Sequence, residues 1–254
     1  MRRVATLIFI LTIVSGCGRK GPLIYPEMTA PAAPTAVSAR QTGQAIQLSI
    51  DLPQKDQAGR KLANLAGVSI LRRAAPMGQS PDCSACMEGF SLFRKLYLDL
   101  PLSESGVQRF GSQLVLRDEK VRESEEYSYT VTPFTKDSQD GLPSRPITTR
   151  MVVPPSAPMV KAEPHPTEIR LVFSSTPQIN GVFVGYNLYR TQKGDVLPFL
   201  PLTNEPIAGN SFVDVGLVRS QMYVYAARTV IRLPTGKLVE SELSGEVEAR
   251  LTNE

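Results

Sequence analysis

Two pairs of segments in this chain match each other, and this internal repeat constrains the fold more than any other feature of the sequence. The segment LRDEKVRESEEYSYTV from Leu116 aligns without a gap with FVDVGLVRSQMYVYAA from Phe212, so that corresponding residues lie 96 positions apart. Upstream, GVSILRR from Gly67 matches GYNLYRT from Gly185. A repeat of this kind indicates one structural unit that is built twice. We therefore expect two similar domains in tandem.

Each half also carries short stretches in which apolar and polar residues alternate. Side chains two positions apart project from the same face of a β-strand, so alternation predicts strands with one buried face. The apolar positions that share a face in this way are Ile46, Leu48, Ile50 and Leu52; Tyr127, Tyr129 and Val131; Ile169, Leu171 and Phe173; and Tyr223, Tyr225 and Ala227. Glycine and proline separate these stretches, and no segment sustains the apolar period of about 3.6 residues that is typical of a helix. The predicted fold class is all-β.

The repeats resemble fibronectin type III domains of bacterial surface proteins. In that family an aromatic residue, an aspartate, a glycine and a leucine precede a tyrosine and an alternating aromatic strand. The matching positions are Phe212, Asp214, Gly216, Leu217, Tyr223 and Tyr225 in the second repeat, and Leu116, Asp118, Val121, Tyr127 and Tyr129 in the first. The usual early tryptophan is absent, and Glu123 and Arg219 replace a common proline. The resemblance implies two tandem immunoglobulin-like β-sandwiches, in which Tyr127 and Tyr223 form tyrosine corners by hydrogen-bonding to nearby backbone.

Shifts in composition divide the chain into four parts. Residues 1–16 are interpreted as a lipoprotein signal peptide, 17–33 as the lipidated N-terminus with a proline-rich stalk, 34–153 as the first domain with an insertion, and 154–254 as the second domain. The segment PEMTAPAAPTA from Pro26 is predicted to be an extended, semi-rigid spacer that packs against nothing. The segment VVPPSAP, residues 152–158, is predicted to be a hinge between the domains.

The N-terminus predicts a lipid anchor. Two arginines follow Met1, and residues 4–14 form an apolar run too short to span a bilayer, which needs about 20 residues. This pattern is typical of a signal peptide. Ser15 and Gly16 then precede Cys17 in a segment that resembles the bacterial lipobox. The resemblance implies a diacylglyceryl group on the Cys17 sulfur, cleavage before this residue, acylation of the new amine, and attachment to a membrane through several fatty chains. The same residues also allow a secreted protein in which Cys17 is incidental, or a short transmembrane anchor.

The residues after Cys17 bear on location. Gly18 stands where an aspartate usually retains such lipoproteins at the inner membrane, which implies the outer membrane and a protein that faces the periplasm. The segment CGRKGPLIYP, which ends at Pro26, resembles the CGxKGPLxxP attachment segment of small Gram-negative lipoproteins. In the alternative interpretation, which we favour, this segment is a flexible basic stalk beside lipid head groups.

A pair of cysteines lies in an insertion. The interval between the repeated glycine and the repeated aspartate is 51 residues in the first half and 29 in the second. The extra residues contain Cys83 and Cys86, which places this pair in a surface loop between strands. Outside the cytoplasm we expect the two to form a disulfide. The pair also allows redox exchange, soft-metal binding with Met77 and Met87, an intermolecular link or free thiols. A structural zinc site needs four ligands, which are not at hand, so neither a metal nor a cofactor is predicted.

Few residues of this chain could support catalysis. Its single histidine, His165, lies between two prolines, so the chain has few of the residues that a catalytic triad or a histidine-based metal site needs. The glutamate-rich segment 122–126 is most simply a solvated turn, and the sequence has no phosphate-binding glycine loop. Without Arg2 and Arg3, the 28 basic residues fall to 26 against 24 acidic ones, an excess too small to indicate nucleic-acid binding. We therefore expect neither an enzyme nor a small-molecule substrate.

These observations favour a membrane-anchored envelope lipoprotein that acts as a non-enzymatic protein-binding or scaffold module, with an envelope protein as its partner. Two alternatives stay open: a redox or soft-metal-handling lipoprotein that uses Cys83 and Cys86, and a polysaccharide-binding envelope module. The candidate partner surface is the segment of residues 81–93, which contains Met87, Phe90, Leu92 and Phe93. These side chains either form an exposed patch or belong to a strand that packs inward, and we favour the inward strand.

Overall fold

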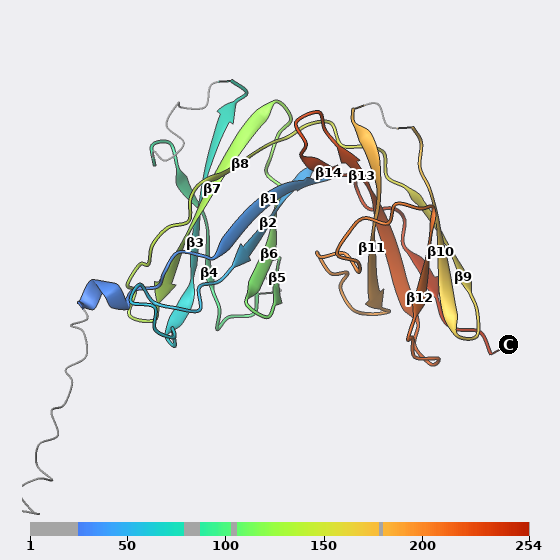
Figure 1. Cartoon of the computed structure of the whole chain (residues 1–254), viewed down its shortest axis with the longest axis horizontal. Helices are drawn as coiled ribbons and strands as arrows, with labels where there is room; N and C mark the ends of the chain where they lie inside the picture. Colours follow the sequence, from blue (N-terminus) through green and yellow to red (C-terminus); the bar gives the residue numbers. More distant parts are fainter. Residues whose placement is uncertain (1–24, 79–86, 103–105, 178–179, 254) are drawn as a thin grey trace, which may run out of the picture.

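The computed structural model describes residues 25–78, 87–102, 106–177 and 180–253, and Figure 1 shows their arrangement. This part of the chain consists of β-strands and connecting segments, apart from a short 3-10 helix, η1, over Pro26–Thr29. The strands of the first domain are β1 (Ala36–Thr42), β2 (Ala45–Asp51), β3 (Leu65–Pro76), β4 (Ser91–Tyr97), β5 (Val107–Phe110), β6 (Gln113–Asp118), β7 (Glu125–Thr135) and β8 (Ile147–Arg150). Those of the second are β9 (Met159–Pro164), β10 (Glu168–Ser174), β11 (Val182–Gln192), β12 (Ser211–Val215), β13 (Tyr223–Arg232), β14 (Leu238–Glu240) and β15 (Val247–Ala249).

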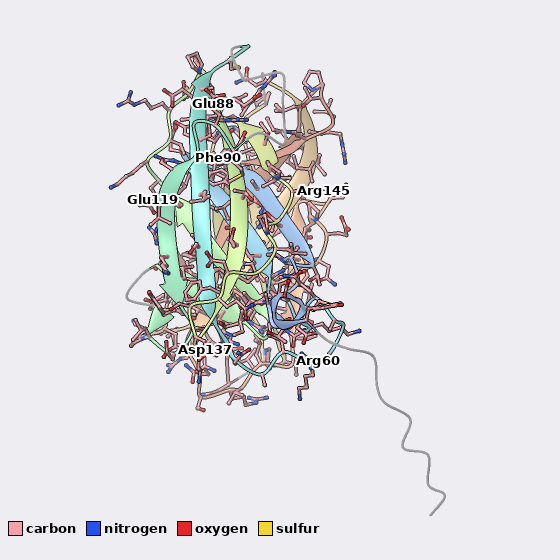
Figure 2. All side chains as sticks on the ribbon, turned by 90° about the vertical axis from the view of Figure 1, so that its left-hand side faces the viewer. Arg60, Glu88, Phe90, Glu119, Asp137 and Arg145 are labelled. Atoms are coloured by element: carbon pink, nitrogen blue, oxygen red, sulfur yellow. The ribbon has the colours of Figure 1, made fainter. Side chains whose placement is uncertain are left out.

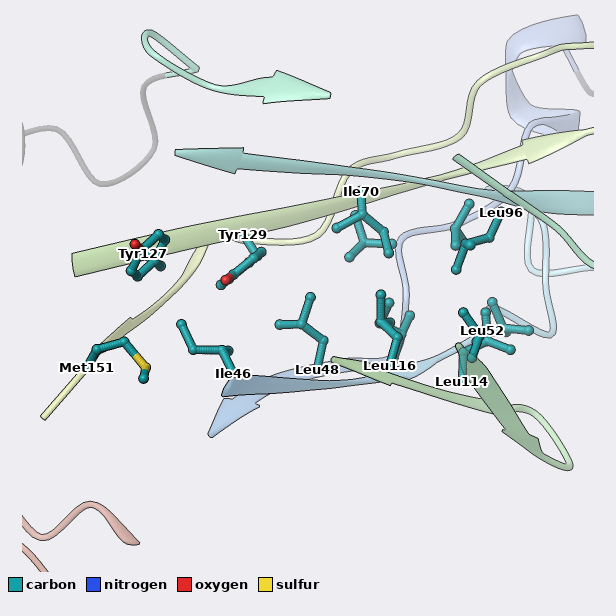
Figure 3. Packing of buried hydrophobic residues seen from close by; sticks show 14 residues of the cluster. Ile46, Leu48, Leu52, Ile70, Leu96, Leu114, Leu116, Tyr127, Tyr129 and Met151 are labelled. Atoms are coloured by element: carbon teal, nitrogen blue, oxygen red, sulfur yellow. The ribbon is translucent and has the colours of Figure 1, made fainter. Parts of the chain in front are cut away.

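The first domain is a sandwich of two antiparallel sheets. One sheet has the order β1-β2-β6-β5, and the other has the order β4-β3-β7-β8. Side chains from both sheets meet in one apolar cluster, in which Ile70, Leu96 and the two tyrosines of β7 face Ile46, Leu48 and Leu116 (Figure 3). Burial of this apolar surface stabilises the sandwich by about 25 cal/mol for each Å² removed from water.

The second domain repeats this arrangement with fewer strands. Strands β9, β10 and β12 form one sheet, while β13 pairs with β11 on one side and with β14 and β15 on the other. The buried cluster between the sheets contains Val160, Ile169, Leu171, Phe173, Tyr186, Leu188, Tyr223, Tyr225, Ala227, Ala249 and Leu251. All the positions that the alternation in sequence assigned to a buried face are therefore buried.

The predicted all-β fold of two tandem sandwiches is confirmed, and so are both tyrosine corners. The backbone amide of Arg122 donates a 2.8 Å hydrogen bond to the hydroxyl oxygen of Tyr127. In the second domain the amide of Val218 donates a 3.0 Å bond to the hydroxyl oxygen of Tyr223. Each bond spans five residues, so the two corners are built in the same way.

The two sandwiches share a sheet. Strand β1 of the first domain pairs in parallel with β14 of the second, with Gln41 opposite Val239 and Thr42 opposite Glu240. This pairing joins the β1-β2-β6-β5 sheet to the sheet of β11, β13 and β14, which makes one eight-stranded sheet. In Figure 1 the two domains lie side by side and meet where β14 approaches the end of β1.

The predicted hinge between the domains is bonded to the first domain at its first residue. The side chain of Gln41 forms two bonds with Val152: its Nε2 donates to the carbonyl oxygen at 2.6 Å, and its Oε1 accepts from the amide at 3.0 Å. Both partners are backbone groups, so the link satisfies the first residue of the proline-rich segment completely. The interdomain segment is therefore docked onto β1 at its start.

The predicted spacer is wrong for its described residues. The carbonyl of Ala30 accepts a bond from the amide of Gln57, and the carbonyl of Met28 accepts one from Ala58, each at 3.0 Å. On the other side, the carbonyl of Pro31 accepts a bond from Leu142 at 3.1 Å. Ala30 and Pro31 are buried, so this segment packs on the first domain instead of extending away from it.

Candidate functional site

The repeated aspartate has the same role in both domains. In the first domain Asp118 Oδ2 accepts hydrogen bonds from Arg72 Nη1 at 2.7 Å and from the Tyr129 hydroxyl at 2.8 Å. In the second domain Asp214 accepts bonds from Arg190 at 2.7 and 2.9 Å and from the Tyr225 hydroxyl at 2.7 Å. Burial and the nearby carboxylate raise the pKa of Tyr129 and of Tyr225 above the ordinary phenol value. Both triads tie three strands together and are structural.

A buried carboxylate lies at the junction between the domains. The side chain of Glu240, which is 3% exposed, accepts hydrogen bonds from Asn187 Nδ2 at 2.9 Å and from the Tyr189 hydroxyl at 2.7 Å. Arg40 of the first domain forms an ion pair with it at 3.1 Å. The fully buried Arg228 places its Nε 3.8 Å from the same carboxylate. Burial and the Glu240 charge raise the pKa of Tyr189, so its hydroxyl stays protonated and can donate to Glu240.

A second set of contacts lies beside the first. Gln108 of β5 donates through Nε2 to the carbonyl of Leu197 at 2.9 Å and accepts from the amide of Phe199 at 2.6 Å. The guanidinium of Arg117 lies over the Phe199 ring, 4.5 Å from its centroid. Desolvation and the nearby Arg228 lower the pKa of Arg117. Together with the shared sheet, these contacts fix the orientation of one sandwich relative to the other.

Sequence reasoning missed this junction. Its polar residues occupy outward-facing positions on β11, β13 and β14, where an isolated sandwich would expose them to water. One signal was available: the segment YVYAARTVI from Tyr223 is apolar at nearly every position, and strands buried on both faces have that composition. In the structure β13 is indeed buried from Tyr223 to Ile231. Arg228 interrupts this segment at the position where it meets Glu240.

The predicted partner surface divides into buried and exposed side chains. Phe93 packs against the core cluster, as the inward strand requires. Phe90 is half-buried beneath Arg73, whose guanidinium lies 4.8 Å from the ring centroid. Met87 and Leu92 are exposed, Leu92 to 59%. Figure 2 views the molecule from this side and shows Phe90 near the upper end of the sheet. The surface beside β4 therefore keeps part of the predicted apolar patch.

The remaining predicted site residues are placed as follows. Cys17, Cys83 and Cys86 lie outside the described residues, so the lipid attachment and the disulfide stay predictions. His165 is exposed in the turn between β9 and β10, where its amide donates to the Glu168 carbonyl at 2.8 Å. Among the described side chains, no group of three or more histidine, cysteine, aspartate or glutamate residues could hold a metal ion. In the same part of the chain, no helix has the length and apolarity needed to cross a membrane.

No protein-family model matches the sequence, and no curated protein matches it significantly. Among solved structures, the FN1–FN3 domains of chicken CNTN1 are 14% identical to this chain, with 88% of this chain and 69% of that one covered and a TM-score of 0.33. A structure titled as a myokine is 16% identical, with 38% of this chain and 97% of that one covered and a TM-score of 0.30. Similarities this weak carry no conclusion about function, and the fold assignment rests on the strand order and tyrosine corners of the chain itself.

Proposed function

We propose that this chain is a lipid-anchored protein of the bacterial envelope that acts without catalysis, by holding a binding surface in a fixed position. The observation that carries the proposal is the junction at Glu240. Two sandwiches that share a sheet and a buried carboxylate form one rigid body. Rotation of one against the other would break the pairing of β1 with β14 and would leave the buried Glu240 charge without Arg40. A rigid body of this kind suits a scaffold that presents surfaces of both domains to a protein partner.

The anchor in this proposal is the lipid on Cys17. The segment that precedes it and the small residues beside it support the proposal, as described from the sequence. Intact-mass measurement of the mature protein tests it directly: we expect a chain that begins at Cys17 and carries the mass of fatty acyl groups. The variant Cys17→Ser should lack that mass and leave the detergent phase on partition. A mature protein without fatty acyl groups would overturn this part of the proposal.

The binding surface in this proposal is the side of the first domain that contains β4. We suggest a photo-crosslinking amino acid at Leu92, and a matched one at Val182, which is 72% exposed on the second domain. Both positions are exposed and apolar, so they differ mainly in location. In intact cells we expect a discrete protein adduct from position 92 and none from position 182. No adduct from position 92, or the same adducts from both positions, would contradict the proposed binding surface.

A further inference from the structure

Strand β4 leaves one edge of its backbone unpaired. It is the first strand of the β4-β3-β7-β8 sheet, and no strand in the described part of the chain pairs with its outer edge. Along an antiparallel ladder, backbone groups point alternately toward and away from the partner strand. The amide of Leu98, just after β4, donates to the carbonyl of Ala66 at 2.8 Å. By this alternation the amides of Lys95 and Tyr97 face away from β3 and are available to another strand.

The two basic residues of β4 project from opposite faces of the sheet. Lys95 lies opposite Ser69, on the outer face, and its ammonium is 4.6 Å from the centroid of the Phe134 ring. Arg94 lies opposite Ile70, a core residue, and so belongs to the inner face. Strand β4 therefore presents a positive charge on each side of its unpaired edge, at neighbouring positions, and contains no acidic residue.

A β-bulge shapes the inner side of this edge. The ladder shifts register between Ile70, opposite Arg94, and Leu71, opposite Leu92, so Phe93 is the extra residue. Its ring lies against the core, and the guanidinium groups of Arg72 and Arg94 are 5.0 and 5.4 Å from the ring centroid. The ring and the two guanidinium groups together line the surface beside the strand.

A groove of about 350 Å³ lies next to this surface, between β4 and the end of β6. Strand β5 pairs with residues 113–116 of β6, so this pairing ends before Arg117, one of the groove's residues. The charged residues of its lining are Arg72, Arg94, Arg117, Asp118, Glu119 and Lys120. The negative charge of Asp118 is already matched by Arg72, and its side chain is fully buried. Beyond this pair the lining contains three basic residues, Arg94, Arg117 and Lys120, and one acidic residue, Glu119, which Figure 2 shows at the edge of the sheet, so the net charge of the lining is positive.

We propose that β4 binds an extended, acidic segment of a partner protein by strand addition, an inference that rests on the proposed function. The backbone of the added strand would bond to the outward amides of Lys95 and Tyr97. Because Arg94 and Lys95 lie on opposite faces, two adjacent acidic residues in the added strand would face one basic residue each. A second copy of β4 is a poor occupant, since its own Arg94 and Lys95 would bring like charges together.

Synthetic peptides test this proposal with the purified full chain in detergent. The probe is a labelled eight-residue peptide of alternating threonine and valine with two adjacent glutamates at its centre. The first control has two lysines in place of the glutamates, and the second carries N-methyl groups on alternate residues, which block one edge of the peptide. Fluorescence anisotropy should show that the glutamate peptide binds, that the lysine peptide binds at least about tenfold more weakly, and that N-methylation of the bonding edge abolishes binding.

A matched pair of variants tests the role of the charge. Lys95→Glu should weaken binding of the glutamate peptide several-fold and strengthen binding of the lysine peptide. Lys161→Glu, at an exposed lysine of β9, should change the binding of neither peptide. Hydrogen exchange adds a readout on the unsubstituted chain: the amides of Lys95 and Tyr97 should become protected when the glutamate peptide binds. Equal binding of the glutamate and lysine peptides would overturn the proposal, and so would the absence of binding. Full binding both of a peptide N-methylated at its odd positions and of one N-methylated at its even positions would also overturn it, because one of the two must block the bonding edge.

This experiment and the crosslinking experiment fail separately. If position 92 captures a protein in cells but the glutamate peptide does not bind, the binding surface stands and strand addition is wrong. If the peptide binds and position 92 captures nothing, strand addition is possible in this chain but the proposed function is contradicted.

Discussion

The hydroxyl group of Tyr189 on β11 donates a 2.7 Å hydrogen bond to Glu240 on β14, and both side chains are buried at the junction of the two domains. Arg40, on the first domain, reaches the same carboxylate. A buried charge of this kind is stable only when its partners remain in place. The relation between these residues therefore links the stability of the second domain to the position of the first.

We expect Glu240→Ala to lower the free energy of unfolding by about 3–5 kcal/mol, because it removes the buried carboxylate beside Arg228 and leaves only that of the exposed Glu242, 3.9 Å away. Chemical denaturation of the full chain measures this change. The matched control is Glu248→Ala, which removes an exposed ion pair with Lys193 and should cost less than about 1 kcal/mol. Equal effects of the two substitutions would show that the buried Glu240 contributes no more to the free energy of unfolding than an exposed ion pair does.

The repeated aspartates predict equivalent effects in the two domains. Asp118→Asn and Asp214→Asn each keep the shape of the side chain but remove the charge that faces an arginine. We expect each to destabilise its own domain by about 1–3 kcal/mol. Differential scanning calorimetry of both variants checks this. A large loss for one and none for the other would mean that the two triads are not equivalent, despite their matching geometry.

Gly67 allows two strands and a ring to approach closely. A Cβ atom there would lie 2.6 Å from Cζ of Phe134 and would also collide with the carbonyl oxygen of Leu96. We expect Gly67→Ala to destabilise the chain by about 1–3 kcal/mol through overpacking. Gly209→Ala is the matched control, since nothing lies within 4 Å of its Cβ position, and it should be close to neutral. Thermal unfolding of the two variants distinguishes them, and an unaffected Gly67→Ala would refute the close packing described.

Alkaline pH should weaken the fold through the buried phenols. Burial, followed by the hydrogen bond to Glu125, raises the pKa of Tyr127 to about 12 in the folded chain. Since the folded value is above the unfolded value of about 10, the protonated phenol favours the folded state. This stabilisation is complete below about pH 10 and is lost as the pH rises through about 12.

Denaturation at a series of alkaline pH values measures this loss of stability. Tyr127→Phe should reduce the pH dependence without removing it, because burial also raises the pKa of Tyr129, Tyr189 and Tyr225. If the absorbance of phenolate showed that every tyrosine of the folded chain ionises near pH 10, this explanation of alkaline unfolding would be wrong.

The strands and both cores could be predicted from sequence because their cause is local. Alternation at positions such as Ile46 and Leu48 decides which face of a strand is buried, whatever lies elsewhere in the chain. The repeat likewise located Asp118 and Asp214, since each triad lies within one domain. These features needed no knowledge of how the two domains are arranged.

The junction could not be predicted because its cause is remote in sequence. Gln41 pairs with Val239, and nothing in the sequence around either residue indicates that the two strands pair. Polar side chains such as Asn187 and Glu240 are read as solvated until the neighbouring domain covers them. The register shift that turns Phe93 inward is likewise a property of the β3–β4 ladder, which the alternation within one strand does not reveal.

The distance between labels on the two domains tests the rigid junction most directly. Spin labels can be placed through a bio-orthogonal amino acid at Gln57 and Arg170, which are both exposed and lie in different domains. We expect one narrow distance distribution for the unsubstituted chain, and a broader one when Gln41→Ala and Glu240→Ala remove the links described. A broad or multiple distribution in the unsubstituted chain would contradict the conclusion that the two sandwiches form one rigid body.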